Sequence, residues 1–243
     1  MKAGREPASL PLFHSELGLA RLRRSVRGSV RSFASRAPLA RHGQPLGAVH
    51  VVLSGLVALT STSDGGRQAT LALIGPGGVL GQESVLPMSG VLGSSPFGPA
   101  DLEAPQVDAV AFVPCTTLAL PAGELRGAFD RDPLIAAWLA ASLGHRVRAL
   151  ERGLSRSLSF PVRERVLHVL LELAATYGAR RPWGVIVELP LSQDDIAALV
   201  GATRESVNRA LRQLETSGAV CRVDRAYAVR DRDVDHGAES GVS

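Results

Sequence analysis

Apolar positions along the chain follow two different periods, and the period changes near residue 131. Between residues 46 and 121, short apolar runs such as HVVLSGLVALT (50–60) are separated by turn-forming residues. Their spacing of about ten residues is typical of short strands joined by tight turns. Beyond residue 131, apolar positions recur every three or four residues, as in an amphipathic helix. The pattern predicts an α+β protein, β-rich first and helical afterwards.

The β-rich half predicts an antiparallel β-roll of the jelly-roll kind. SDGGRQ (63–68) reads as a hairpin turn, because Asp-Gly-Gly supplies positive φ angles. ATLALIGPGGVL (69–80) predicts another strand followed by a Pro-Gly turn. Residues 107–121 return to strand character and end at a proline. The segment 87–106, rich in Gly, Ser and Pro, is expected to be a long loop.

A long helix is predicted after Asp132, which is a suitable N-cap before Pro133. Its apolar stripe runs through Leu139, Leu143, Val147, Leu150, Leu154 and Leu158. About 27 residues at 1.5 Å each span ~40 Å, which is longer than a small barrel can cover. We therefore expect a homodimer through residues 132–158. Packing of this helix on its own domain is the alternative.

Two short helices separated by Gly201 are predicted near the C-terminus. Ser192 and Asp195 form a capping box, so the first helix begins at 193. Thr203 can cap the second helix, and Gly201 suits the tight turn between them. The second helix carries an i, i+3, i+4, i+7 apolar stripe made of Val207, Ala210, Leu211 and Leu214. These features predict a helix-turn-helix, preceded by a helix over 162–178 and a strand over 185–190.

The polar side of the second helix predicts contacts with DNA bases, because such helices read base edges in the major groove. Arg204 and Arg209 can each donate two hydrogen bonds to guanine, and Glu205 can accept one from cytosine. Asn208 lies on the same outward side. Phosphate contacts are expected from residues near the two helix starts, namely Ser192, Gln193, Thr203 and Ser206. A hairpin over 218–230, with Arg222 and Arg225, is expected to form a wing against the DNA backbone.

Composition favours an anionic partner only mildly. The formal net charge is +4, and Lys2 is the single lysine, so the basic residues are nearly all arginine. Residues 1–45 are rich in arginine and are expected to form a basic arm with a short helix at 15–27. No apolar stretch is long enough to cross a membrane, and no signal peptide begins the chain. We expect a cytoplasmic protein with no membrane partner.

The segment LSQDDIAALVGATRESVNRALRQLETSGAV (191–220) resembles the winged helix-turn-helix of the Crp/Fnr family of bacterial transcription regulators. Residues 204–209 match the family's recognition pattern Arg-Glu-x-Val-x-Arg. HVVLSGLVAL, SDGGRQ and LALIGPGGVLGQES resemble its cyclic-nucleotide-type β-roll. The resemblance implies a non-enzymatic homodimer that binds double-stranded DNA at a palindromic TGTGA-like site, with RNA polymerase as a further partner.

The resemblance also implies a domain division. An effector-type β-roll with its basic arm is expected over 1–130, and the long dimerisation helix over 131–159. The winged helix-turn-helix is expected over 160–232, and a flexible tail over 233–243.

The candidate ligand segment Gly81-Gln82-Glu83-Ser84 departs from the family pattern. Members that bind cyclic AMP use a Gly-Glu pair for the ribose and an Arg-Ser or Arg-Thr pair for the phosphate. Here no arginine or lysine lies between Arg67 and Arg126. A phosphate without a cation would lose its charge-assisted hydrogen bonds. We expect no cyclic AMP dependence, and either another effector or constitutive DNA binding.

No cofactor, metal or catalytic residue is expected. An iron–sulfur cluster needs four ligands, and the two cysteines, Cys115 and Cys221, cannot supply them. Both are expected to be reduced structural thiols, with a thiol switch at Cys115 as a weaker alternative. Haem would need an axial ligand from His42, His50 or His145.

Two other functional classes are alternatives to a specific regulator. A metal-dependent enzyme on the β-roll is disfavoured, because His14, His42 and His50 lack the His-x-His spacing of such sites. An architectural DNA-binding protein of low specificity is the other alternative.

Overall fold

The computed structural model describes residues 22–44, 46–63, 65–85 and 107–230. The chain divides into two compact units. The sheet unit comprises residues 8–61 and 71–150, and the winged unit comprises residues 1–7, 62–70 and 151–243. The expected loop at 87–106 and the expected tail at 233–243 lie outside the described residues.

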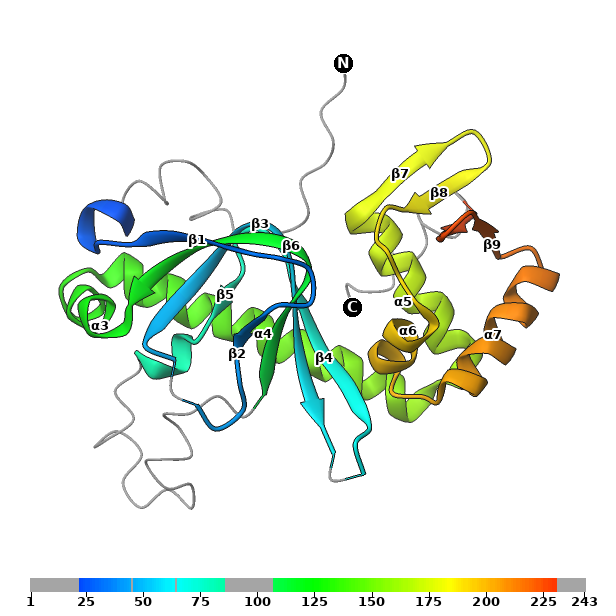
Figure 1. Ribbon diagram of the computed structural model, residues 1–243, viewed down its shortest axis with the longest axis horizontal. Helices are drawn as coiled ribbons and strands as arrows, with labels where there is room; N and C mark the ends of the chain where they lie inside the picture. Colours follow the sequence, from blue (N-terminus) through cyan, green and yellow to red (C-terminus); the bar gives the residue numbers. More distant parts are fainter. Residues whose placement is uncertain (1–21, 45, 64, 86–106, 231–243) are drawn as a thin grey trace. The chain divides into compact units, whose positions relative to one another are not determined.

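The sheet unit is built on antiparallel pairing around two long strands. The strands are β1 (Ser29–Phe33), β2 (Pro38–Ala40), β3 (Ala48–Thr62), β4 (Gln68–Ile74), β5 (Val79–Leu80) and β6 (Asp108–Pro121). Their order is β1-β6-β3-β4, with β2 pairing β6 and β5 pairing β3 (Figure 1). The predicted strands at 50–60 and 107–121 are confirmed as the central pair.

The N-terminal segment contains a short helix and two strands. The helix expected at 15–27 lies partly outside the described residues, and within them residues 22–25 are helical. The strands β1 and β2 that follow were not predicted. Their sequences, SVRSF and PLA, carry too few apolar residues to signal strands. They form because β6 supplies a partner for the backbone groups of both.

A bulge in the middle of β3 changes which of the two hydrophobic cores its odd-numbered positions face. The register against β6 shifts between Val52 and Val57, around Gly55 at φ 81°. A Cβ at Gly55 would lie 2.2 Å from the Pro114 carbonyl oxygen, so only glycine fits. Val51 therefore packs in one core and Val57 in the other, although both positions are odd.

Helices cover one face of this sheet. They are α3 (Ala122–Arg131) and the long α4 (Pro133–Ser159), after a short 3-10 turn η1 (Gln82–Ser84). Leu125 of α3 and Ile135 and Leu139 of α4 are fully buried in the core that also holds Val51. The helix α3 was not predicted, since its Gly123 and Gly127 weaken the helical pattern.

The predicted long helix is confirmed. The Asp132 carboxylate accepts a hydrogen bond from the Leu134 N–H (3.0 Å), so Asp132 caps the start of α4. The helix runs for 27 residues. Its first turns are buried, whereas its later apolar positions are exposed, with relative accessibilities of 52% for Val147, 62% for Leu154 and 79% for Leu158.

The winged unit packs three helices against a four-stranded sheet. Its elements are α5 (Val162–Tyr177), β7 (Gly178–Arg181), β8 (Gly184–Val187), α6 (Gln193–Val200), α7 (Arg204–Thr216), β9 (Val220–Val223) and β10 (Ala226–Val229). The sheet order is β7-β8-β10-β9, and all its pairs are antiparallel. Figure 1 shows α7 beside α6, with β9 following it in the chain. The strand expected at 185–190 is β8, which ends earlier, and its partner β7 was not predicted.

Candidate nucleic-acid interface

The start of α6 is fixed by the predicted capping box. Ser192 Oγ accepts a hydrogen bond from the Asp195 N–H (3.1 Å), and Asp195 Oδ2 accepts one from the Ser192 N–H (2.9 Å). The helix ends at Gly201, whose φ of 62° is left-handed. These contacts satisfy amide groups that a helix start leaves unpaired and turn the chain sharply towards α7.

The helix α7 divides cleanly into a buried and an exposed side. Thr203 Oγ1 accepts a hydrogen bond from the Ser206 N–H (3.2 Å), which confirms the predicted cap. The buried side consists of the four predicted apolar residues, Val207, Ala210, Leu211 and Leu214. Their burial in the core of the winged unit holds the opposite, polar side of α7 towards solvent.

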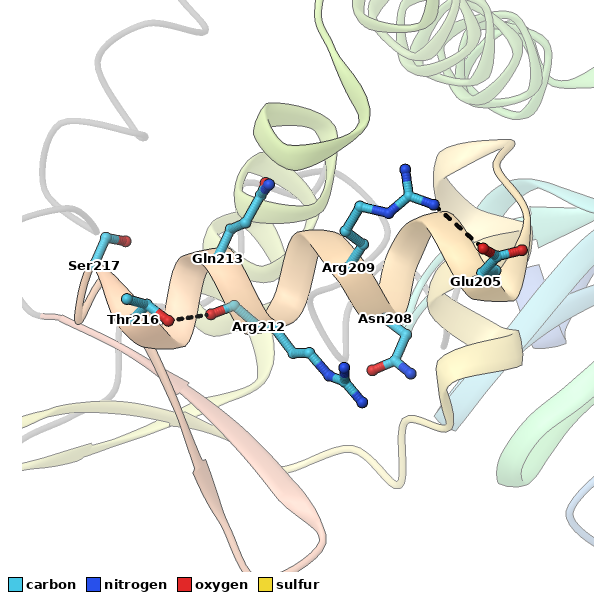
Figure 2. Close-up of a pocket in the computed structure, with 7 residues that line it drawn as sticks. All are labelled: Glu205, Asn208, Arg209, Arg212, Gln213, Thr216 and Ser217. Carbon is cyan, nitrogen blue, oxygen red and sulfur yellow. Dashed lines mark hydrogen bonds and ion pairs between the residues drawn. The ribbon is translucent and has the colours of Figure 1, made fainter.

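Charged and amide groups on this polar side are paired with one another. Arg209 Nη2 lies 3.2 Å from Glu205 Oε1 one turn away (Figure 2). Arg204 Nη1 lies 3.4 Å from Asp194 Oδ2 on α6. Gln193 Nε2 donates to Asn208 Oδ1 (3.5 Å), a second link between the two helices. The structure thus brings the predicted base-reading residues together on one surface.

A shallow depression of about 560 Å³ runs along α7. Figure 2 shows Asn208 and Arg212 projecting from one side of the helix, and Arg209 and Gln213 from the other. The residues lining it are Glu205, Asn208, Arg209, Arg212, Gln213, Thr216 and Ser217. The last four, in the second half of α7 and at its C-terminal cap, were not among the predicted contacts. Guanidinium, amide and hydroxyl groups can donate hydrogen bonds to base edges and phosphates, and a carboxylate can accept one from a base amino group.

The predicted wing is the β9–β10 hairpin. Its turn contains Asp224 at φ 53°, a left-handed conformation that Asp tolerates. Arg222 and Arg225 are both exposed, and the Arg222 guanidinium lies 5.9 Å from the Tyr227 ring centroid. Burial raises the pKa of Tyr227, so its phenol stays neutral beneath this arginine. The hairpin presents fixed positive charge to solvent.

The candidate ligand residues of the sheet unit surround η1. Gly81 has φ 77°, and its carbonyl oxygen accepts a hydrogen bond from the Ser84 hydroxyl (2.7 Å). Gln82 is buried, and its Oε1 has no protein partner among the described residues. Arg126 donates to the Ser84 carbonyl oxygen (2.8 Å). The side chain of Glu83 lies outside the described part of the structure.

Two of the candidate cofactor residues, His50 and Cys115, are buried in the protein interior. His50 is buried, its Nδ1 is 3.0 Å from Thr117 Oγ1, and burial together with the charge of Arg31 lowers its pKa to about 4. Burial raises the pKa of the Cys115 thiol, which disfavours the reactive thiolate. Both cysteines are free thiols, with Cys115 buried and Cys221 exposed.

Metal-binding clusters and membrane-spanning helices are both absent from the described ranges. No group of three or more His, Cys, Asp or Glu side chains in this part of the chain could hold a metal ion. None of its helices is both long and apolar enough to cross a membrane.

Both units of the chain match models of known protein families. Residues 30–132 match the family model of the cyclic nucleotide-binding domain, and residues 164–234 match that of the Crp-like helix-turn-helix domain. The cyclic AMP receptor protein of Thermus thermophilus is 31% identical over 86% of this chain and 88% of its own length. A CRP-like cAMP-activated global transcriptional regulator of Mycobacterium tuberculosis is 27% identical over 79% of each chain.

The solved structures agree on the fold. The c-di-GMP responsive global regulator CLP of Xanthomonas campestris superposes with a TM-score of 0.73 at 22% identity, covering 87% of this chain and 97% of that one. The expected α+β fold is confirmed by this structural similarity. The expected non-enzymatic function agrees with the Mycobacterium tuberculosis relative, which is a transcriptional regulator. With a nucleotide-binding-type sheet unit, a DNA-binding winged unit and a relative of 31% identity, this chain belongs to the Crp/Fnr family of transcription regulators.

Proposed function

We propose that this regulator acts as a homodimer on a palindromic TGTGA-like DNA site, without needing cyclic AMP. The observation that carries the proposal is the polar side of α7. There Arg204, Glu205 and Arg209 project from a helix whose other side is locked into the core. A recognition helix needs this combination of a rigid base and exposed hydrogen-bonding groups.

In this proposal Arg204 and Arg209 read guanines and Glu205 accepts from a cytosine amino group. The Glu205–Arg209 pair orients both side chains before DNA arrives, because residues four apart meet on one helix face. Phosphates are bound by groups near the starts of α6 and α7 and by the wing. The groups proposed near the helix starts are Ser192, Gln193, Thr203 and Ser206, and Asn208 lies on the base-reading side of α7.

The homodimer is supported by the exposed stripe on α4. Leu154 and Leu158 are more than half exposed in the single chain, although they continue the stripe that Leu139 begins in the core. Leucines this exposed in a row favour a partner surface. Two copies related by a two-fold axis would present two α7 helices to half-sites about one DNA turn, ~34 Å, apart. The DNA-bound dimer would act on transcription by contacting RNA polymerase.

Independence from cyclic AMP is supported by the residues around η1. The stretch from 68 to 125 contains no cation for a cyclic phosphate, and Gln82 stands where family members that bind cyclic AMP carry glutamate. Arg126 approaches this turn, but it donates to a backbone carbonyl there. A regulator that responds to another effector in the sheet unit is the second candidate. It is favoured by the buried Gln82 Oε1, which has no partner among the described residues.

Fluorescence anisotropy with a labelled palindromic TGTGA duplex tests the proposal. We expect tight binding that is unchanged by cyclic AMP and at least about 1000-fold weaker binding to a scrambled duplex. Arg209→Ala should relax the preference at one guanine by roughly 1–3 kcal/mol. Equal affinity for both duplexes would show an architectural DNA-binding protein instead. Binding that requires cyclic AMP would refute the nucleotide independence.

A further inference from the structure

Arg204 has an acidic neighbour that lies on a different helix. Asp194 Oδ2 is 3.4 Å from Arg204 Nη1, and both side chains are 67% exposed. The adjacent Asp195 carboxylate is occupied by the capping box, where it accepts from the N–H and the hydroxyl of Ser192. Asp194 is therefore the carboxylate in the first turn of α6 that faces α7.

We propose that Asp194 is a positioning residue that determines how strongly this regulator discriminates its DNA site from other sequences. It holds the Arg204 guanidinium for base reading and disfavours binding to the phosphate backbone alone. The proposal rests on the function proposed above. It concerns a residue outside the base-reading set of Arg204, Glu205 and Arg209.

The positioning step follows from the shape of the arginine head group. A guanidinium carries five N–H donors in one plane. One donor directed at Asp194 leaves others for the O6 and N7 atoms of guanine. Without this partner, the long Arg204 side chain is free to swing to a phosphate, the commonest partner of arginine on DNA. A phosphate contact would add affinity for every sequence equally.

The charge of Asp194 acts in the same direction. Helix N-termini attract phosphates, and in helix-turn-helix proteins the first helix crosses the DNA backbone. The Asp194 carboxylate weakens, without abolishing, the phosphate binding proposed for Ser192 and Gln193 at the start of α6. Specificity is a difference between two affinities, and an element that weakens the wrong complex raises it. Exposed ion pairs contribute little to folding, so stability alone gives no reason for the pair.

A second contact between α6 and α7 supports the approach of Asp194 to Arg204. Gln193, the neighbour of Asp194, donates to Asn208 on α7. The two links hold the first turn of α6 against the N-terminal half of α7. The Asp194 carboxylate is thereby kept near Arg204 by the fold and not by its own flexible side chain.

The test compares Asp194→Asn with Glu164→Gln by anisotropy on the TGTGA duplex and the scrambled duplex. Glu164 is also an acid in the first turn of a helix, α5, so its variant controls for the lost charge and the helix start. We expect Asp194→Asn to reduce the ratio of the two affinities by about tenfold. Its binding to the scrambled duplex should also depend more steeply on salt, by up to about one unit of slope. Asp194→Glu should keep most of the discrimination.

A double variant shows whether Asp194 acts through Arg204. Asp194→Asn added to Arg204→Ala should change the affinity ratio less than Asp194→Asn changes it in the wild type, because only the effect of the Asp194 charge remains. Far-ultraviolet circular dichroism first shows whether Asp194→Asn is folded like the wild type. The proposal is overturned if the folded variant keeps the wild-type affinity ratio, or changes it no more than Glu164→Gln does. If the wild-type protein itself failed to discriminate the two duplexes, the proposed function would fail first.

Discussion

Acidification should destabilise the sheet unit through one buried histidine. His50 is 4% exposed, packs edge-on against Phe33 and shares a hydrogen bond with Thr117. Burial, and secondly the positive charge of Arg31, lowers its pKa from 6.5 to about 4. The unfolded chain therefore takes up a proton below pH 6.5 that the folded chain refuses until about pH 4. The stability is fully present above pH 6.5 and is lost as the pH falls towards 4.

The magnitude follows from the two pKa values. A shift of one unit corresponds to about 1.4 kcal/mol, so His50 alone should lower the free energy of unfolding by roughly 2 kcal/mol between pH 7.5 and pH 5. Carboxylates add their own pH dependence at low pH. The contribution of His50 is therefore the difference between the wild type and His50→Asn, in which the titrating ring is absent.

Urea unfolding followed by circular dichroism at a fixed protein concentration measures this difference. His50→Asn should be less stable than the wild type at pH 7.5, because the ring leaves a cavity, but should lose about 2 kcal/mol less on going to pH 5. The same substitution at the exposed His42 is the matched control and should follow the wild type. If the wild type and His50→Asn lose the same stability between the two pH values, the inference that His50 is neutral in the folded protein is wrong.

Three further predictions concern the α4 stripe, a half-buried arginine contact and the bulge in β3. Leu154→Glu, on the exposed stripe of α4, should weaken dimerisation by roughly 100-fold in sedimentation experiments, because it removes apolar contact and adds a charge. An unchanged dimer would contradict the proposed interface. The Arg165 guanidinium donates a hydrogen bond to the carbonyl oxygen of the last residue of α6 (2.8 Å). Arg165→Met should therefore lower the free energy of unfolding, measured in urea, by about 1.5–3 kcal/mol. Unaltered stability would show that the contact is dispensable. Gly55→Ala should be more damaging, by about 2 kcal/mol, than Gly66→Ala, because both glycines have positive φ but only a Cβ at Gly55 would collide with the Pro114 carbonyl. Equal losses in the two glycine variants would refute the crowding argument.

Long periodic elements could be predicted from the sequence, and short supported ones could not. The helix α4 and the pair α6–α7 have apolar stripes or caps that are local in the chain, so their positions followed from spacing alone. The strands β1, β2 and β7 hold few apolar residues, and they exist because a neighbouring strand satisfies their backbone groups. The helix α3 was missed because its Leu125 and Ala128 become informative only once the core that receives them is known.

The candidate site shows the same division. Arg204, Glu205 and Arg209 could be chosen because their helical positions place them opposite the apolar stripe of α7. The partnership of Arg204 with Asp194 could not, since ten residues and a turn separate them and their approach depends on how the two helices pack. Likewise, the approach of Arg126 to Ser84 depends on the packing of α3, which the sequence did not reveal.

The sharing of β3 between two hydrophobic cores has a consequence for how the sheet unit opens. Because β3 contributes Val51 to one core and Val57 to the other, unfolding of either core would disrupt this shared strand. The sheet unit should therefore behave as one cooperative unit in native-state hydrogen exchange. Amides of β3 on both sides of the bulge would then exchange with a common opening free energy, and damage to either core would lower the protection of both.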